Sequence, residues 1–126
     1  MIEHVSIAVR DLERAAGFYD AVLETLDYRR RLERDAAVGY ATDAQTAPAF
    51  WLLERRAERA VRPGPGLHFC FRAPSEATVH AFYATALEQG GRDAGAPGLR
   101  PQYLGRFYGA FVIDLDGYKI EATHRT

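Results

Sequence analysis

His4-Val5-Ser6-Ile7-Ala8-Val9 and His68-Phe69-Cys70-Phe71-Arg72-Ala73 stand 64 residues apart, and each begins with histidine and continues like a strand. Two dipeptides recur at the same offset: Phe18-Tyr19 with Phe82-Tyr83, and Leu23-Glu24 with Leu87-Glu88. A single offset shared by several matches is typical of an internal repeat rather than of chance. The sequence therefore predicts two halves that are built alike.

Each half begins with a strand and a helix. In Ile2–Val9, apolar residues occupy every second position, which is typical of a strand with one buried face. Apolar residues then recur at helical spacing after Asp11 and after Ser75, two residue types that cap helix N-termini. Gly90-Gly91 supplies an end for the second helix.

Further strands complete each half. Three follow the first helix, near Tyr28–Glu33, Val38–Thr42 and Ala49–Leu53. In the second half, Tyr108–Leu115 and Tyr118–Thr123 flank Asp116-Gly117, a strong signal for a two-residue hairpin. The predicted fold class is α+β with two βαβββ modules: module 1 at about residues 1–57, a linker at about 58–65, and module 2 at about 66–126.

The composition narrows the classes of function. The 126 residues include 16 basic and 17 acidic ones, which gives a formal net charge of −1. Binding to nucleic acid or to an anionic membrane needs a basic stripe or cluster, so we expect neither partner. Cys70 is the one cysteine, which excludes an internal disulfide and fits a reducing compartment. The sequence shows no secretory signal and no apolar run of about 20 residues, so we expect a cytoplasmic protein.

Strand alternation places three metal-binding side chains on one predicted surface. The apolar face of each first strand must meet the helices, which leaves His4 and His68 on the opposite face. In the last strand Glu121 points the same way, whereas Tyr118 and Ile120 point inward. Two imidazoles and one carboxylate suit a divalent transition metal and leave coordination positions open for water or substrate. The sequence thus predicts one divalent metal ion held by His4, His68 and Glu121.

Each of these residues also has an ordinary structural interpretation. A single histidine in a strand is more often a hydrogen-bonded residue than a ligand, and Glu121 by itself is typical of a solvated strand. The repeat relation between His4 and His68, with a carboxylate on the same face, favours the metal site. Cys70 shares a face with His68, but we expect it to be buried and inert.

The whole pattern resembles the vicinal oxygen chelate superfamily, which includes glyoxalase I, extradiol dioxygenases, fosfomycin-resistance thiol transferases and bleomycin-binding proteins. Four segments carry the resemblance: His4–Leu12, Phe18-Tyr19, Gly66–Phe69 and Asp114–Glu121. The resemblance implies a cup-shaped mixed eight-stranded sheet with helices on the outside, and a homodimer in which two chains complete each cup. Carried over, the metal ligands are again His4, His68 and Glu121, with Glu121 also the catalytic candidate. The implied metal is iron, manganese, zinc or nickel.

The sequence departs from individual branches of that family. Trp51 best fits the slot where glyoxalase I enzymes carry a carboxylate ligand, and Phe111 stands where fosfomycin enzymes carry a tyrosine. The loop Gly98–Phe107 is expected over the cup mouth, where arginine would pair with a substrate carboxylate or phosphate. An ordinary core position for Trp51 and a solvated loop are the alternatives. The candidate substrate-binding residues are Trp51, Arg100, Tyr103, Arg106, Tyr108 and Phe111.

Two kinds of function follow from this reasoning. The first is a metal-dependent enzyme whose small substrate chelates the metal through neighbouring oxygens, with lyase, isomerase, dioxygenase or thiol-transferase chemistry. The second is a metal-free protein that binds a drug or metabolite, as bleomycin-resistance proteins do. The predicted ligand set favours the enzyme, and metal content distinguishes the two.

Overall fold

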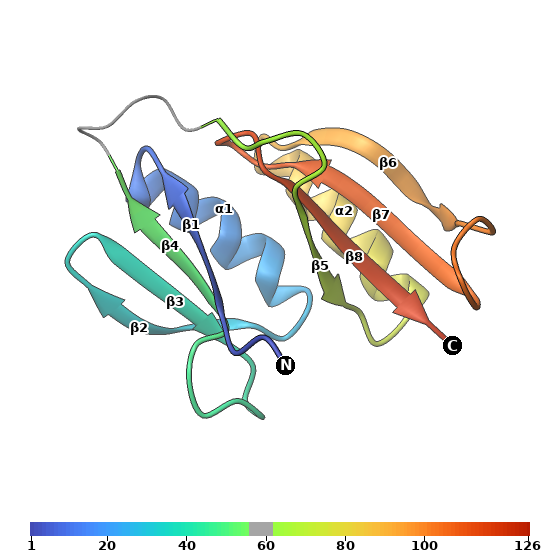
Figure 1. Cartoon of the computed structure of the whole chain (residues 1–126), viewed down its shortest axis with the longest axis horizontal. Coiled ribbons are helices and arrows are strands. Elements are labelled where there is room, and N and C mark those ends of the chain that lie inside the picture. The colour runs from blue at the N-terminus through green and yellow to red at the C-terminus, as the bar shows by residue number, and fades with distance from the viewer. Residues whose placement is uncertain (56–61) are drawn as a thin grey trace.

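The computed structural model describes residues 1–55 and 62–126. These residues form two helices and eight strands, arranged as two βαβββ modules (Figure 1). Module 1 comprises β1 (Val5–Val9), α1 (Leu12–Glu24), β2 (Arg29–Arg34), β3 (Ala37–Ala41) and β4 (Phe50–Glu54). Module 2 comprises β5 (His68–Arg72), α2 (Glu76–Glu88), β6 (Arg92–Leu99), β7 (Phe107–Ile113) and β8 (Lys119–Arg125). The predicted α+β class is confirmed, and the predicted linker at 58–65 lies partly outside the described residues.

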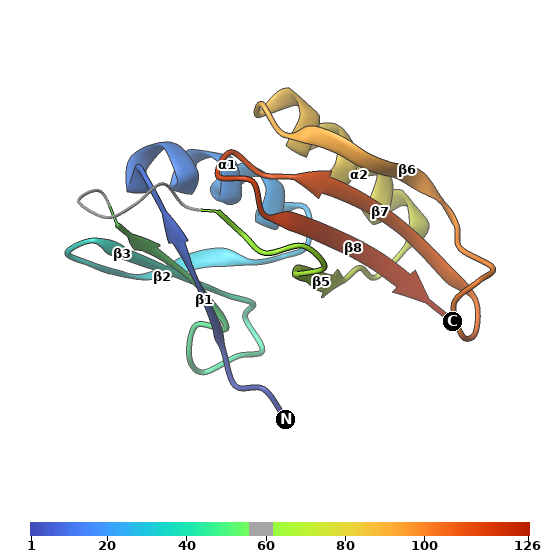
Figure 2. The same cartoon turned by 45° about the horizontal axis from the view of Figure 1, so that its top comes forward.

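Both modules form a four-stranded mixed sheet with the same topology. The strand order is β1-β4-β3-β2 in sheet 1 and β5-β8-β7-β6 in sheet 2. In each sheet the first strand of the module pairs in parallel with the last, and the remaining pairs are antiparallel. The two sheets are separate within the chain (Figure 2), and β1 and β5 are edge strands.

Each helix covers one face of its own sheet and leaves the other face open. In β1, Ile7 and Val9 are buried, as alternation predicts, while Ser6 is exposed. Leu67 would share the face of Phe71 by alternation, but it lies one residue before β5 begins and is 46% exposed. The period-two pattern of burial therefore holds in β1, whereas every residue of β2 is exposed and four consecutive residues of β8 are buried.

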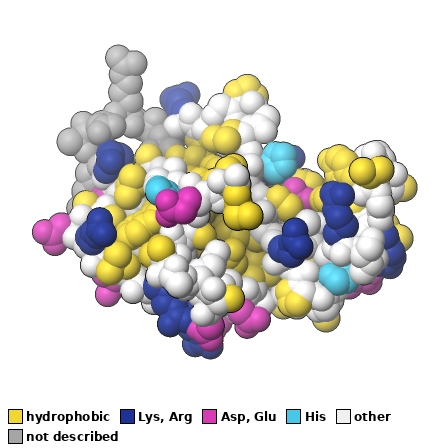
Figure 3. Space-filling view, turned by 60° about the horizontal axis from the view of Figure 1, so that its bottom comes forward, with side chains coloured by type: hydrophobic (Ala, Val, Ile, Leu, Met, Phe, Trp, Pro, Cys, Tyr) yellow, Lys and Arg dark blue, Asp and Glu magenta, His cyan; other side chains and the backbone are white. Residues whose placement is uncertain are grey.

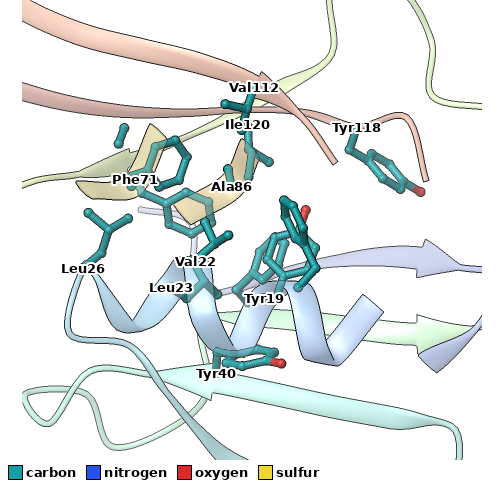
Figure 4. Packing of buried hydrophobic residues seen from close by; sticks show 14 of the residues in the cluster. Tyr19, Val22, Leu23, Leu26, Tyr40, Phe71, Ala86, Val112, Tyr118 and Ile120 are labelled. Atoms are coloured by element: carbon teal, nitrogen blue, oxygen red, sulfur yellow. The ribbon is translucent and has the colours of Figure 1, made fainter. Parts of the chain in front are cut away.

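One hydrophobic core spans both modules. The helices α1 and α2 contact each other, and side chains from both sheets pack around them. Figure 4 shows this packing between α1 and module 2: Tyr19, Val22, Leu23, Phe71, Val112 and Ile120. The ring centroids of Phe50 in β4 and Phe71 in β5 lie 5.4 Å apart, which continues the contact between the sheets.

The predicted helix ends are confirmed by their capping contacts. Asp11 caps α1, because its Oδ1 accepts a hydrogen bond from Arg14 N at 3.1 Å. Ser75 caps α2 in the same way, with Oγ accepting from Thr78 N at 3.1 Å. Gly90, just after α2, has a φ of 95°, which glycine adopts without steric cost. Within residues 1–55 and 62–126, no helix is long and apolar enough to cross a membrane.

The turn between β7 and β8 also forms hydrogen bonds that connect module 2 to module 1. Asp114 Oδ1 accepts hydrogen bonds from the backbone N–H groups of Asp116 and Tyr118, at 2.9 and 2.8 Å. Its Oδ2 accepts from the hydroxyl of Tyr19 in α1. Asp116 accepts from the backbone N–H of Arg10 at 3.0 Å. The predicted hairpin is therefore present, but its connection spans Asp114–Tyr118 instead of two residues, and its two carboxylates contact both modules.

Strand β6 occupies the start of the predicted loop Gly98–Phe107. Its sequence contains two glycines and a proline, which remove the alternating pattern expected of a strand. Its pairing with β7 is irregular, with register shifts around Gly95. The loop is therefore shorter than predicted, and Arg100 directly follows the end of β6.

Candidate metal centre

His68 and Glu121 meet on the open face of sheet 2. The strands β5 and β8 are parallel neighbours, and their register pairs Cys70 with Glu121. His68 Nε2 lies 3.4 Å from Glu121 Oε2. The His68 side chain is 43% exposed and that of Glu121 only 3%. The pair thus combines a buried carboxylate with an accessible imidazole.

The surroundings of Glu121 suit a cation. Within the described residues, Glu121 Oε1 is the one buried side-chain nitrogen or oxygen atom that has no hydrogen-bond partner. Burial raises the pKa of Glu121 above its usual value, and the nearby Cys70, His68 and Lys119 oppose that rise. A buried oxygen without a donor costs free energy unless a positive group approaches it. A carboxylate oxygen beside an imidazole nitrogen is a donor set that fits a divalent transition metal.

His4 lies on the open face of sheet 1, apart from the other two predicted ligands. It precedes β1, its side chain is 46% exposed, and its Nδ1 lies 3.2 Å from Glu3 Oε1. An open cavity of about 260 Å³ beside it is also lined by Ser6 and Trp51. Among the described residues of one chain, no three histidine, cysteine, aspartate or glutamate side chains form a group that could hold a metal ion. One chain therefore brings together two of the three predicted ligands.

Three nitrogen-bearing side chains surround the ring of Phe111. Its centroid lies 6.2 Å from that of His68, 5.7 Å from Arg100 Cζ and 4.7 Å from Lys119 Nζ. Phe111 and Arg100, both predicted to bind substrate, thus lie next to the His68–Glu121 pair. Lys119 is absent from the predicted set, although it alternates in phase with Glu121, and this spacing was the signal that could have identified it.

Two further candidates point away from this pair. Trp51 lies on the open face of sheet 1, where Arg34 Cζ is 5.4 Å from the centre of its ring. Tyr108 faces α2, and its hydroxyl lies 2.6 Å from His80 Nε2. Because neighbouring side chains of a strand alternate, Tyr108 and Phe111 lie on opposite faces of β7.

The loop after β6 holds the remaining candidates. Arg106 Nη1 lies 2.5 Å from Glu76 Oε1 at the start of α2, so this arginine is directed toward the helix. Tyr103 packs on Phe107, the first residue of β7, with 4.8 Å between ring centroids, four residues before Phe111. Of the two arginines predicted over the cup, the structure brings only Arg100 to the His68–Glu121 pair.

The prediction that Cys70 is buried is wrong. Cys70 is exposed on β5, directly across from Glu121, because no element among residues 1–55 and 62–126 covers the open face of sheet 2. Loss of solvent around the thiol and the negative charge of Glu121 raise the pKa of Cys70 to about 12. The thiol is therefore protonated at neutral pH, and its Sγ donates weakly to Phe71 O at 4.0 Å.

Known proteins share this architecture. The family model described as the Glyoxalase/Bleomycin resistance protein/Dioxygenase superfamily matches residues 1–122. A glyoxalase/bleomycin resistance protein from Albidiferax ferrireducens T118 is 32% identical, with 98% of each chain covered and a TM-score of 0.87. A glyoxalase-related enzyme from Fulvimarina pelagi, 16% identical, shares the fold with a TM-score of 0.77 over 99% of this chain and 88% of that one. No curated protein matches the sequence. The chain belongs to the Glyoxalase/Bleomycin resistance protein/Dioxygenase superfamily.

Proposed function

We propose that the protein is a divalent-metal-dependent enzyme whose small substrate chelates the metal through two neighbouring oxygen atoms. One observation carries this proposal: the buried Glu121 Oε1 has no hydrogen-bond partner among the described residues and lies beside the accessible imidazole of His68. A carboxylate with a purely structural role at this depth normally has donors for both oxygens.

Each residue of the site has a distinct role in this proposal. His68 and Glu121 provide two ligands, and Phe111 provides an apolar wall for the substrate. When bound, a divalent iron, manganese, zinc or nickel ion supplies a Lewis acid that stabilises negative charge on a substrate oxygen. Glu121 is also the catalytic candidate, because its carboxylate borders the position that metal and substrate would share. Lyase, isomerase, dioxygenase and thiol-transferase chemistry are all compatible with such a site.

The third ligand, His4, is proposed to come from a second copy of the chain. In the described part of the chain, β1 and β5 each have one edge without a neighbouring strand. A cavity of about 300 Å³ between them is lined mainly by apolar side chains, including Ile2, Val5, Phe50 and Phe69. Figure 3 shows hydrophobic side chains gathered over the middle of one face of the molecule. These features favour a homodimer in which sheet 1 of one chain meets sheet 2 of the other.

Metal analysis tests the site directly. Protein purified without an affinity tag or chelator is expected to contain about one equivalent of a divalent transition metal per chain. The variant His68→Ala should contain much less, whereas His80→Ala should match the wild type, because His80 contacts Tyr108 on the helix side. Elemental analysis after dialysis measures the content. If the wild-type protein binds no divalent transition metal even when each ion is added, the metal-dependent enzyme is rejected and a metal-free binding protein is favoured.

Mixed dimers test whether the site is shared. His4→Ala and His68→Ala chains each lack one ligand, so neither homodimer has a complete set. If sites form between chains, the mixed dimer has one site with both substitutions and one intact site. Mixed dimers separated by ion exchange, with one chain carrying a charged tag, are therefore expected to hold about one metal ion each. No metal in them, or a monomer in analytical ultracentrifugation, would contradict the shared site.

A further inference from the structure

Two cations lie on the open face of sheet 2 beside the proposed metal centre. Arg100 and Lys119 both lie against the ring of Phe111, with Arg100 Cζ 5.7 Å and Lys119 Nζ 4.7 Å from its centroid. Phe111 is the register partner of Glu121, and Lys119 lies two residues before Glu121 on the same face of β8. The positive groups therefore lie within electrostatic range of the position where substrate would meet metal.

Arg100 is held in place by the backbone of β6. Its Nη1 donates to Gly98 O at 3.0 Å, and its Nη2 donates to Ala96 O at 2.7 Å. Two glycines make room for it: a Cβ atom at Gly95 would lie 3.2 Å from Nη2, and one at Gly98 would lie 3.2 Å from Nη1. A guanidinium has five N–H donors, so these two bonds fix its position and leave donors for a ligand. Such preorganisation lowers the entropy cost of binding.

The charge of this face is unbalanced. Within residues 1–55 and 62–126, Arg100 and Lys119 form no ion pair, and Glu121 is an acidic side chain on the same face of sheet 2. One carboxylate against two cations leaves an excess of one positive charge, and a divalent metal would raise the excess to three. The two cations and the metal repel one another in a partly desolvated site. An anionic ligand would lower this repulsion and stabilise the loaded protein.

We propose that the substrate carries a carboxylate or phosphate group in addition to its metal-chelating oxygens, and that Arg100 and Lys119 bind this group. The inference rests on the proposed function, because it takes the neighbouring metal as the anchor for the rest of the substrate. Arg100 is the primary recognition group, since its planar fork matches the oxygen spacing of carboxylate and phosphate. Lys119 adds a mobile positive charge.

Isothermal titration of the manganese-loaded protein tests this with two ligand pairs. In the first pair, 2-oxoglutarate and 2-oxopentanoate both offer a 2-oxo acid to the metal, but only the former has a distal carboxylate. In the second, 3-phosphoglycerate and glycerate share a 2-hydroxy acid and differ in the phosphate. The wild type is expected to prefer the additional anion by about ten- to a hundredfold in at least one pair, the range for a charge-assisted hydrogen-bonded contact. The pair that shows the preference identifies the oxyanion.

Three variants locate the source of the preference. Arg100→Gln should reduce it to about twofold while leaving the affinity for the shorter acid nearly unchanged. Gly98→Ala keeps the charge but crowds the guanidinium, so it should lose part of the preference. Arg14→Gln removes an exposed charge from α1 and should behave as the wild type.

The outcomes separate this inference from the function on which it rests. If the protein holds manganese but binds both members of each pair equally, or if Arg100→Gln keeps the full preference, the anion site is rejected and the metal centre stands. If the wild type holds no metal in the same preparation, the proposed function fails and the inference fails with it.

Discussion

Replacing Glu121 with glutamine is expected to stabilise the metal-free protein and to abolish its stabilisation by metal. The Glu121 carboxylate is 3% exposed and has one oxygen without a donor, a desolvation cost that the His68 contact at 3.4 Å only partly offsets. A neutral amide keeps the shape and lowers that cost, so the free energy of unfolding should rise by about 1–2 kcal/mol. Metal at about 100 times its Kd should add about 2.7 kcal/mol to the wild type and little to the variant.

The increase in the free energy of unfolding caused by Glu121→Gln in the metal-free protein should grow as the pH rises. Burial raises the pKa of Glu121, so the folded metal-free protein binds this proton more readily than the unfolded chain does. The stability that the protonated carboxyl contributes is fully present below its unfolded-state pKa and is lost as the pH rises through the higher folded-state pKa. The advantage of Glu121→Gln is therefore expected to be small in acid and to grow toward neutral pH.

Urea denaturation of metal-free and metal-loaded protein measures both effects. Glu88→Gln is the matched control, because this carboxylate is exposed on α2 and its replacement should change stability by less than about 0.5 kcal/mol. A less stable metal-free Glu121→Gln protein would show that the contact with His68 outweighs the cost of burial. Glu121 would then be a structural residue, and the argument for a cation at Oε1 would lose its basis.

The faces of the strands could be predicted because side-chain alternation is a local property of the backbone. His68 and Glu121 share the open face of sheet 2, as their positions within β5 and β8 require. The location of His4 relative to them could not be predicted, since alternation assigns it to a face of sheet 1 but does not determine which sheet lies opposite. That relation depends on how modules, or chains, pack against each other.

The directions of the side chains in the loop after β6 could not be predicted, for a different reason. Arg100 and Arg106 are close in sequence, yet one lies over Phe111 and the other contacts Glu76 on α2. The direction of Arg100 depends on the irregular backbone of β6 and on carbonyl groups that a regular strand would engage in its ladder. The sequence shows the glycines of β6, but it does not show which side chain packs against them.

Asp114→Ala is expected to reduce the free energy of unfolding by about 3–5 kcal/mol, the range for removing one member of a buried charged network. The loss has a direct structural cause, because Asp114 is 5% exposed and accepts from Tyr19 in module 1 and from two backbone N–H groups of the β7–β8 turn. Alanine leaves all three donors unpaired in the interior. The same residue that the sequence marks as part of a hairpin therefore also stabilises the contact between modules.

Hydrogen bonding, rather than negative charge, should account for this effect. Burial raises the pKa of Asp114, so ionisation is less favourable in the folded state than in the unfolded chain. Asp114→Asn removes the charge and keeps an oxygen acceptor for the two backbone N–H groups, but it leaves the Tyr19 O–H without an acceptor, so it should cost about 1–3 kcal/mol, less than alanine. Thermal and urea denaturation of both variants make the comparison. If Asp114→Asn lowers the free energy of unfolding as much as Asp114→Ala does, the negative charge of the carboxylate is required. Hydrogen bonds to the two backbone N–H groups would then not explain the stability of the contact between the modules.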